Sequence, residues 1–253
     1  MKTVLTGLAL CLVCAATPKA FGVPEKVSLI KIDGAIGPAT ASYISRSIDE
    51  ARAQNAQCLV IQLNTPGGLL DSTQTIVQSF LGSTVPVVVY VAPTGGSATS
   101  AGCFITIAAS VAAMAPATTI GAAHPVMLGG NPTGAEEKVD ETMKQKLENF
   151  SVSYIETIAA KRHRNVEWAK SAVKESASIS AEKALELKVI DLIAADLPQL
   201  LKQLEGRVVD GKTLKTAHAE VTEIKMSASE RVFQKLWRPE VMFILMLIAI
   251  YGI

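Results

Sequence analysis

The sequence predicts an α/β fold with a mostly parallel sheet around one hydrophobic core. Apolar runs of strand length alternate with segments of helical spacing, which is the order produced when strands are joined through crossover helices. Two of these runs, Cys58–Asn64 and Val85–Ala92, are predominantly apolar, as expected of strands covered on both faces. With 253 residues and a hydrophobic composition of 49%, the chain can bury one complete α/β core.

The first half of the chain supplies the clearest strand and helix patterns. We expect strands at Lys26–Asp33, Cys58–Asn64 and Val85–Ala92, and a strand or strand-like turn at Thr118–His124. Amphipathic helices are expected at Pro38–Asn55 and Leu69–Phe80. The segment Ala101–Met114 follows a turn rich in Gly, Ser and Thr and is expected to form one long buried helix.

The second half opens with Met127–Ala135, whose Gly, Asn, Pro and Thr content is typical of a loop. Helices are expected at Glu136–Arg162, Val166–Lys174 and Leu197–Leu204, with a buried strand at Val189–Ile193. Ser180 is placed to cap another short helix, and Asp210-Gly211 predicts a hairpin turn. The loop and the helix after it either cover a cleft as a lid or form a surface insertion.

Both ends of the chain are apolar. Residues 1–22 combine a basic start, an apolar run and small residues, which predicts a secretory signal peptide; an uncleaved membrane anchor is the alternative. Residues 23–205 are expected to form the main domain, and residues 206–240 an extension that ends in a membrane-proximal amphipathic segment. Residues 241–253 carry no charge and are expected to begin a transmembrane segment, with a buried C-terminal strand or helix as the soluble alternative.

Composition excludes several function classes. The chain has 24 basic and 23 acidic residues, so no strong field exists to attract nucleic acid, and we expect no nucleic-acid partner. Cys11 and Cys14 lie in the signal segment, whereas Cys58 and Cys103 are expected to be buried thiols, which gives no disulfide framework. Two core cysteines and three scattered histidines do not suggest a zinc site, and no cofactor is implied.

Two turns carry the chemistry. The strand ending at Asn64 runs into Pro66-Gly-Gly68, where glycines allow backbone amides to approach a ligand. Ser100 falls at the junction between the next strand and its helix, where free N–H groups and the helix dipole favour an anion. One turn thus offers oxyanion donors and the other a nucleophile, although Ser97, Thr99 and Ser100 are also ordinary helix-capping residues.

These motifs resemble the ClpP/crotonase superfamily and, within it, the NfeD family of membrane serine proteases, relatives of signal peptide peptidase A. The matching stretches are Asn64-Thr-Pro-Gly-Gly68, Gly96-Ser-Ala-Thr-Ser-Ala-Gly102, Met114–Pro125 and Lys146-Leu-Glu-Asn149. The resemblance covers the chain from Lys26 to the C-terminus. It implies the ClpP/crotonase-like fold of repeated β-β-α and β-α units, a catalytic dyad of Ser100 and Lys146, and oxyanion donors at Gly68 and Ala101, with Gly67 shaping the turn.

The base that activates Ser100 is open between two proposals. A lysine in an apolar environment can act as a neutral base, and the resemblance assigns this role to Lys146, although Lys138 and Lys144 lie close by. The alternative is a Ser100–His124–Asp191 triad, since ClpP peptidases carry their histidine and aspartate at similar places. Lys146→Ala is expected to abolish activity only if the dyad operates.

The resemblance implies a membrane-associated serine endopeptidase that cleaves apolar polypeptide segments, with stomatin-type membrane proteins as substrates or partners. It also implies a homo-oligomer, a dimer or larger, and a catalytic domain outside the cytoplasm. The rival from another class is a non-catalytic membrane assembly or adaptor protein of the same fold. Because losing an oxyanion donor costs about 10²–10³ in turnover, a side chain at Gly68 is expected to lower turnover more than folding stability.

Overall fold

The computed structural model describes residues 24–126, 141–236 and 239–252. Its centre is a six-stranded sheet in which every neighbouring pair of strands is parallel. Parallel strands need crossover connections, which here run through helices. In sheet order the strands are β11 (Glu220–Glu223), β1 (Lys26–Asp33), β2 (Leu59–Asn64), β3 (Val87–Val91), β5 (Val111–Met114) and β8 (Leu192–Ile193).

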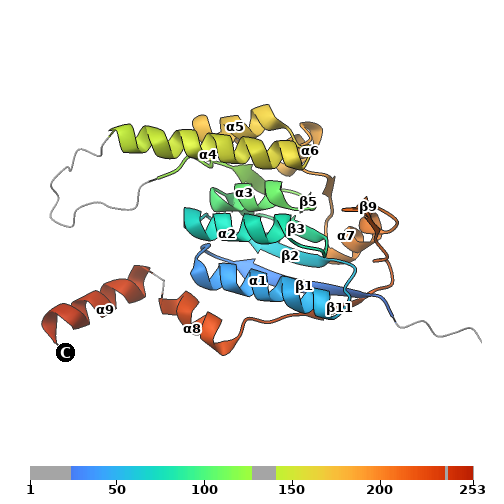
Figure 1. Cartoon of the computed structure of the whole chain (residues 1–253), viewed down its shortest axis with the longest axis horizontal. Coiled ribbons are helices and arrows are strands. Elements are labelled where there is room, and N and C mark those ends of the chain that lie inside the picture. Colours follow the sequence, from blue (N-terminus) through green and yellow to red (C-terminus); the bar gives the residue numbers. More distant parts are fainter. Residues whose placement is uncertain (1–23, 127–140, 237–238, 253) are drawn as a thin grey trace, which may run out of the picture.

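Helices cover both faces of this sheet (Figure 1). One face packs against a large apolar cluster that includes Ile44, Ile76, Ile105 and Ile155 from four successive helices. The other face packs against Leu200 and a short hairpin. On the larger side lie α1 (Pro38–Ala53), α2 (Leu70–Leu81), α3 (Ala101–Ala108), α4 (Glu141–Lys161), α5 (Val166–Lys174) and α6 (Ala181–Glu186); on the other lie α7 (Leu197–Leu204) and the β9 (Val208–Val209) and β10 (Lys212–Thr213) hairpin.

The expected helix over Ala101–Met114 is wrong in its second half. The helix α3 stops at Ala108, Ala109 is extended, and Val111–Met114 forms β5 beside β3. Both pieces are buried and almost entirely apolar, so the hydrophobic pattern alone does not separate the helix from the strand. The strand expected at Val189–Ile193 is likewise shorter, because only Leu192 and Ile193 pair with β5.

A second, three-stranded sheet lies beyond the main one and was not expected as a unit. Ser97–Thr99 (β4) pairs in parallel with Thr119–Gly121 (β6), which pairs antiparallel with Ser178–Ser180 (β7). The strand or strand-like turn predicted within Thr118–His124 is β6. Because β4 leads directly into Ser100, this small sheet positions the predicted nucleophile.

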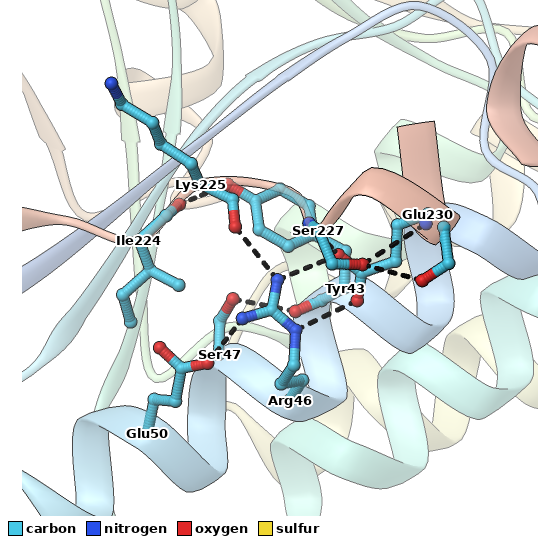
Figure 2. Close-up of polar contacts among 9 residues, drawn as sticks. Tyr43, Arg46, Ser47, Glu50, Ile224, Lys225, Ser227 and Glu230 are labelled. Carbon is cyan, nitrogen blue, oxygen red and sulfur yellow. Dashed lines mark hydrogen bonds and ion pairs between the residues drawn. The ribbon is translucent and has the colours of Figure 1, made fainter. Parts of the chain in front are cut away.

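The C-terminal part is joined to the domain more closely than the boundary expected at residue 205 implies. β11 forms the edge strand next to β1, so the sheet is completed by residues beyond that boundary. Helices α8 (Ala228–Leu236) and α9 (Pro239–Tyr251) follow, and Arg46 of α1 contacts Glu230 of α8 (Figure 2).

Three sequence-based expectations concern the termini and the loop. The predicted signal segment, residues 1–22, and the predicted loop, Met127–Ala135, lie outside the described residues. Within the described part of the chain, no helix combines the length and apolar character needed to cross a bilayer. The helix α9, Pro239–Tyr251, has 13 residues and covers most of the segment 241–253 that was expected to begin a membrane span.

Candidate active site

Ser100 stands at the first position before α3, where the chain turns sharply out of β4. Its φ of 52° and ψ of −112° are uncommon for a residue with a side chain, and such backbone outliers are concentrated at functional sites. The Ser100 amide donates to the carbonyl of Gly121 at 3.0 Å, which fixes the turn to β6. Its hydroxyl makes no capping hydrogen bond to the helix, so the ordinary capping role is not the one it has here.

The Pro-Gly-Gly turn lies directly against Ser100. Thr65, just past the end of β2, forms a parallel bridge with Ala98: its amide donates to Ser97 at 2.8 Å, and its carbonyl accepts from Thr99 at 3.1 Å. This pairing brings the end of β2 beside β4. A β-carbon placed on Gly67 would lie 2.8 Å from the β-carbon of Ser100 and 3.3 Å from its hydroxyl oxygen. The two motifs identified in the sequence therefore form one site.

The backbone around Gly67 and Gly68 is held so that one amide is used and the next is free. Thr65 Oγ1 accepts a hydrogen bond from the Gly67 amide at 3.0 Å, and Gly67 has a φ of +130° that favours glycine. Among the described residues, the amides of Gly68 and Ala101 have no protein acceptor. Both amides remain available as donors, as an oxyanion hole requires.

Gly68 has no room for a side chain. A β-carbon there would lie 2.0 Å from the carbonyl oxygen of Ile36 and 2.6 Å from its nitrogen. Both contacts are with backbone, so the turn itself would have to move. The expectation that a side chain at Gly68 would lower turnover more than stability is therefore wrong: such a variant would disturb the fold as well as the site.

Asn64 is a site residue to which sequence analysis assigned no role. Its Oδ1 accepts a hydrogen bond from the Ser97 amide at 3.0 Å, and its Nδ2 donates to Asp33 Oδ1 at 2.9 Å. It thus links the Pro-Gly-Gly turn to the segment that leads into Ser100. Its position at the end of β2 could have indicated this role, because polar side chains at the carboxyl ends of parallel strands often line ligand-binding sites.

The helix α4 runs parallel to α3 and extends beyond its start. At the far end, Arg162 Nε donates to the carbonyl of Ala108, the last residue of α3. In the middle, the rings of Phe104 and Tyr154 stack with centroids 6.0 Å apart, and Phe150 stacks on Tyr154 at 5.7 Å. One turn back from Phe104 is Ser100, and one turn back from Tyr154 is Phe150.

Lys146 lies on the same face of α4 as Phe150 and Tyr154, because the three are spaced by four residues. The rise of an α-helix puts it about 6 Å further along the axis than Phe150, toward the start of α4. Its side chain is exposed in the single chain and has no hydrogen bond or ion pair within the described residues. Lys144 is exposed on the same helix, and Lys138 lies outside the described residues.

The two residues of the alternative triad are placed apart. His124 Nδ1 lies 3.0 Å from the carbonyl oxygen of Val173. Asp191 Oδ2 accepts from the Ala112 amide at 2.7 Å and pairs with Arg164 at 3.0 Å. Asp191 therefore lies near the start of β5, at the amino edge of the sheet, whereas Ser100 and Gly67 lie past the carboxyl ends of β2 and β3.

Arg164 accounts for the position of Asp191. Its guanidinium is buried and donates to the carbonyls of Ile107, Ala109 and Val189 at 3.0–3.2 Å. Burial lowers the pKa of this guanidinium, and the adjacent Asp191 carboxylate opposes that effect. Asp191 thus balances a buried charge between α3, β5 and the segment after α4.

The described residues contain no evident metal-binding group and no cysteine suited to nucleophilic catalysis. In the parts of the chain that the structure describes, no group of three or more His, Cys, Asp and Glu side chains could hold a metal ion. Cys58 and Cys103 are buried free thiols, and burial raises the pKa of Cys58 to about 12. A buried thiol with a raised pKa is a poor nucleophile.

Comparisons with known proteins show the family of the chain. A sequence model described as the NfeD1b N-terminal domain matches residues 26–226. The membrane-bound protease PH1510 of Pyrococcus horikoshii is 33% identical over 233 residues, which are 90% of this chain and 52% of that protein. The membrane protein NfeD1b of Bacillus subtilis is 25% identical over 265 residues, 100% of this chain and 55% of that protein. The chain spans about half the length of these curated relatives.

Two solved structures show the same fold. One is a serine-to-alanine mutant of 1510-N, a membrane-bound stomatin-specific protease, with a TM-score of 0.73 and 33% identity over 81% of this chain and 100% of that one. The other is a lysine-to-alanine mutant of the same protease in complex with a substrate peptide, with a TM-score of 0.75 and 32% identity over 84% of this chain and 98% of that one. The expected ClpP-like fold is confirmed, and the chain belongs to the NfeD family, with residues 26–226 forming its NfeD1b-type N-terminal domain.

Proposed function

We propose that this chain is a membrane-associated serine endopeptidase that uses a dyad of Ser100 and Lys146. The observation that carries the proposal is the contact of the Ser100 turn with the Pro-Gly-Gly turn, which leaves the amides of Gly68 and Ala101 free beside the hydroxyl. Relatives of the chain are named as proteases, and one solved neighbour is a serine mutant and another a lysine mutant.

In the proposed reaction, the Ser100 hydroxyl attacks the carbonyl carbon of the scissile peptide bond while Lys146 accepts its proton. The oxygen of the tetrahedral intermediate then receives hydrogen bonds from the amides of Gly68 and Ala101. Lys146 passes the proton to the leaving amine as the C–N bond breaks and an acyl-enzyme forms. Water, deprotonated by Lys146, attacks the ester and releases the acid and the serine.

The dyad is favoured over the triad by where the residues lie. Asp191 is engaged with Arg164 and Ala112 at the opposite edge of the sheet, and His124 lies against Val173. Lys146, by contrast, shares a face of α4 with Tyr154, and Tyr154 stacks on Phe104 of the helix that follows Ser100. A lysine acts as a base only when neutral, a state that burial favours. We therefore propose that the bound peptide or a second copy of the chain covers Lys146.

The substrate and setting are proposed from the relatives. The 1510-N protease is described as specific for a stomatin homologue, and a substrate peptide is bound in one of its structures. We propose that this chain likewise cleaves an apolar segment of a stomatin-type membrane protein, with its catalytic domain outside the cytoplasm and in a homo-oligomer. An added extended strand is the binding mode that such sites commonly use.

The test is cleavage of an apolar peptide by the parent chain, Ser100→Ala, Lys146→Ala, Lys144→Ala and Asp191→Asn. We expect both Ser100→Ala and Lys146→Ala to lose at least about 10³ in turnover while keeping the parent circular-dichroism spectrum. Lys144→Ala is the matched control for a lysine on the same helix and should retain activity. Asp191→Asn should lower stability more than turnover.

Other outcomes would reject parts of the proposal. If Ser100→Ala cleaves as fast as the parent, the nucleophile is wrong. Full activity in Lys146→Ala, with loss in a His124→Ala variant, would favour the triad. A folded parent that cleaves no peptide but still captures stomatin-type proteins would support the rival function, a non-catalytic adaptor protein.

A further inference from the structure

The helix α8 has its polarity reversed. Glu230 is its one buried side chain, at 7% exposure, whereas Val232 and Phe233 are 56% and 59% exposed. Leu236 is exposed as well. A helix on the surface of a domain in water normally turns its apolar side inward and its charges outward. The outer face of α8 is therefore suited to surroundings less polar than water.

The inward side is held by a two-pronged ion pair (Figure 2). Arg46 Nε donates to Glu230 Oε1 at 3.0 Å, and Arg46 Nη2 donates to Glu230 Oε2 at 2.8 Å. The same guanidinium reaches the carbonyl of Lys225 at 3.0 Å and the carboxylate of Glu50. Glu230 also accepts from the Ser227 amide at 2.7 Å, so it caps its own helix. Bidentate hydrogen bonds between an arginine and a carboxylate are stronger than hydrogen bonds between neutral groups.

The segment that leads into α8 is fixed to α1 as well. The Tyr43 hydroxyl donates to the carbonyl of Ile224, and the Arg46 guanidinium lies 5.5 Å from the centre of the Tyr43 ring. Ile224 is buried in the main core. The connection from β11 to α8 is thus attached at two successive points, and α8 has a defined orientation on the domain.

The outward side combines apolar and basic groups. Arg231 and Lys235 are exposed on α8 beside Val232 and Phe233. The next helix, α9, carries no charged residue after Glu240 and exposes further large apolar side chains: Ile244, Leu245, Met246, Ile248 and Ile250. An apolar face with basic residues is the pattern of helices that lie in the interface of an anionic bilayer.

We propose that α8 lies on the surface of an anionic lipid bilayer, with Val232 and Phe233 among the acyl chains and Arg231 and Lys235 at the headgroups. The Arg46–Glu230 pair then fixes how the domain sits on that surface. The proposal concerns the outer face of α8 and does not depend on the peptidase chemistry, so the two can be tested separately.

The first test places a reporter on the outer face. Phe233→Trp in the full chain is compared with Val208→Trp, since Val208 is 70% exposed on the hairpin of the opposite face. Emission of the unsubstituted chain is subtracted. With vesicles of phosphatidylcholine and phosphatidylglycerol in equal amounts, we expect a blue shift at 233 and quenching by lipids with brominated acyl chains, and neither effect at 208. In that background, Arg231→Gln with Lys235→Gln should weaken the response to these vesicles and leave any response to pure phosphatidylcholine unchanged.

The second test addresses the ion pair by amide hydrogen exchange of residues 228–236 without lipid. Arg46→Leu should speed exchange about tenfold, because it leaves Glu230 buried and unpaired. Arg52→Leu is the matched control, since Arg52 pairs with Asp49 in an exposed contact on the same helix and should change nothing.

Three results would overturn the proposal. One is an emission spectrum at 233 that neither kind of vesicle alters. Another is a blue shift at 233 that depends on protein concentration without lipid, which would assign the face to a second copy of the chain. The third is equal exchange in Arg46→Leu and Arg52→Leu, which would show that the ion pair does not position α8.

Discussion

Asn64 and Ser97 join the two turns of the candidate site, since Asn64 Oδ1 accepts the Ser97 amide at 3.0 Å. Asn64→Leu keeps the approximate volume of the side chain but leaves that amide without its acceptor, which costs about 1–3 kcal/mol. We expect turnover of an apolar peptide to fall at least about tenfold, because the Ser100 turn loses its support. Urea unfolding measures the first effect and steady-state kinetics the second.

Gln62→Leu is the control for this variant. Gln62 lies two residues earlier on β2, is half-buried and makes no side-chain hydrogen bond within the described residues. It should leave both quantities near those of the parent. A drop in Gln62→Leu as large as that in Asn64→Leu would mean that any polar side chain on β2 matters equally.

Gly102 and Thr65 are packed too closely to allow a methyl group at residue 102. A β-carbon on Gly102 would lie 2.6 Å from Thr65 Cγ2 and 3.3 Å from Ala98 Cβ. We expect Gly102→Ala to destabilise the domain by about 1–3 kcal/mol and to lower turnover. Thr65→Ser removes the clashing methyl group but keeps the hydroxyl that accepts from Gly67. The double variant should therefore recover most of the loss, as a double-mutant cycle of unfolding free energies would show.

Tyr154 joins α3 to α4 through its ring and not through its hydroxyl. The ring stacks on both Phe104 and Phe150, whereas the hydroxyl is buried with no partner in the described part of the chain. Tyr154→Phe should leave stability unchanged or slightly raised, since no partner is left unpaired. Tyr154→Ala should cost about 3 kcal/mol and lower kcat more than it raises KM, because Lys146 loses its alignment.

A readout specific to Lys146 separates positioning from general loosening. The pH profile of kcat should move in Tyr154→Ala and stay in place in Tyr154→Phe. If Tyr154→Ala lowers only stability, with kcat and its pH profile unchanged in the folded fraction, the ring does not position the lysine.

The ion pair between Arg46 and Glu230 makes the attachment of α8 sensitive to acid. The hydrogen bond with Arg46 holds the pKa of Glu230 below its usual value of 4.5, against the opposing effect of burial. A lowered pKa in the folded state contributes stability that is present above the unfolded pKa and is lost as the pH falls through the folded pKa. Arg46 also pairs with Glu50, so one guanidinium is shared between the two carboxylates.

The comparison of parent and Glu230→Gln by urea unfolding tests this. The difference in free energy of unfolding should be largest near neutral pH and should shrink as the pH falls below the usual pKa of 4.5. Glu167→Gln, at a side chain 84% exposed in its ion pair, should show no such trend. A Glu230→Gln difference that stays constant with pH would contradict the assignment.

Local patterns predicted most of the larger elements. The strand Lys26–Asp33 and the helices Val166–Lys174 and Leu197–Leu204 occur with the expected bounds. In each of these elements, the spacing of apolar residues and the residues at the ends indicate the same bounds. The α3–β5 boundary was missed because a buried helix of small residues and a buried strand have the same composition.

The site was predictable in its parts and less so in its assembly. The place of Ser100 at a strand-to-helix junction followed from a run of apolar residues and a small-residue turn. The Thr65–Ala98 pairing and the Asn64–Ser97 hydrogen bond did not, because contacts between short segments more than 30 residues apart leave no periodic trace in the sequence. The same holds for β11, which pairs with the first strand from the other end of the domain.

The direction of β11 also determines where the last helices leave the domain. Because β11 and β2 are both parallel to β1, the carboxyl end of β11 points to the same edge of the sheet as that of β2, beyond which Ser100 lies. A domain attached to lipid through α8 would then carry the proposed nucleophile, Ser100, on the side nearest the lipid. Substrates would then be selected by their distance from the bilayer, since a polypeptide segment close to the headgroups reaches the serine sooner than one arriving from bulk solution.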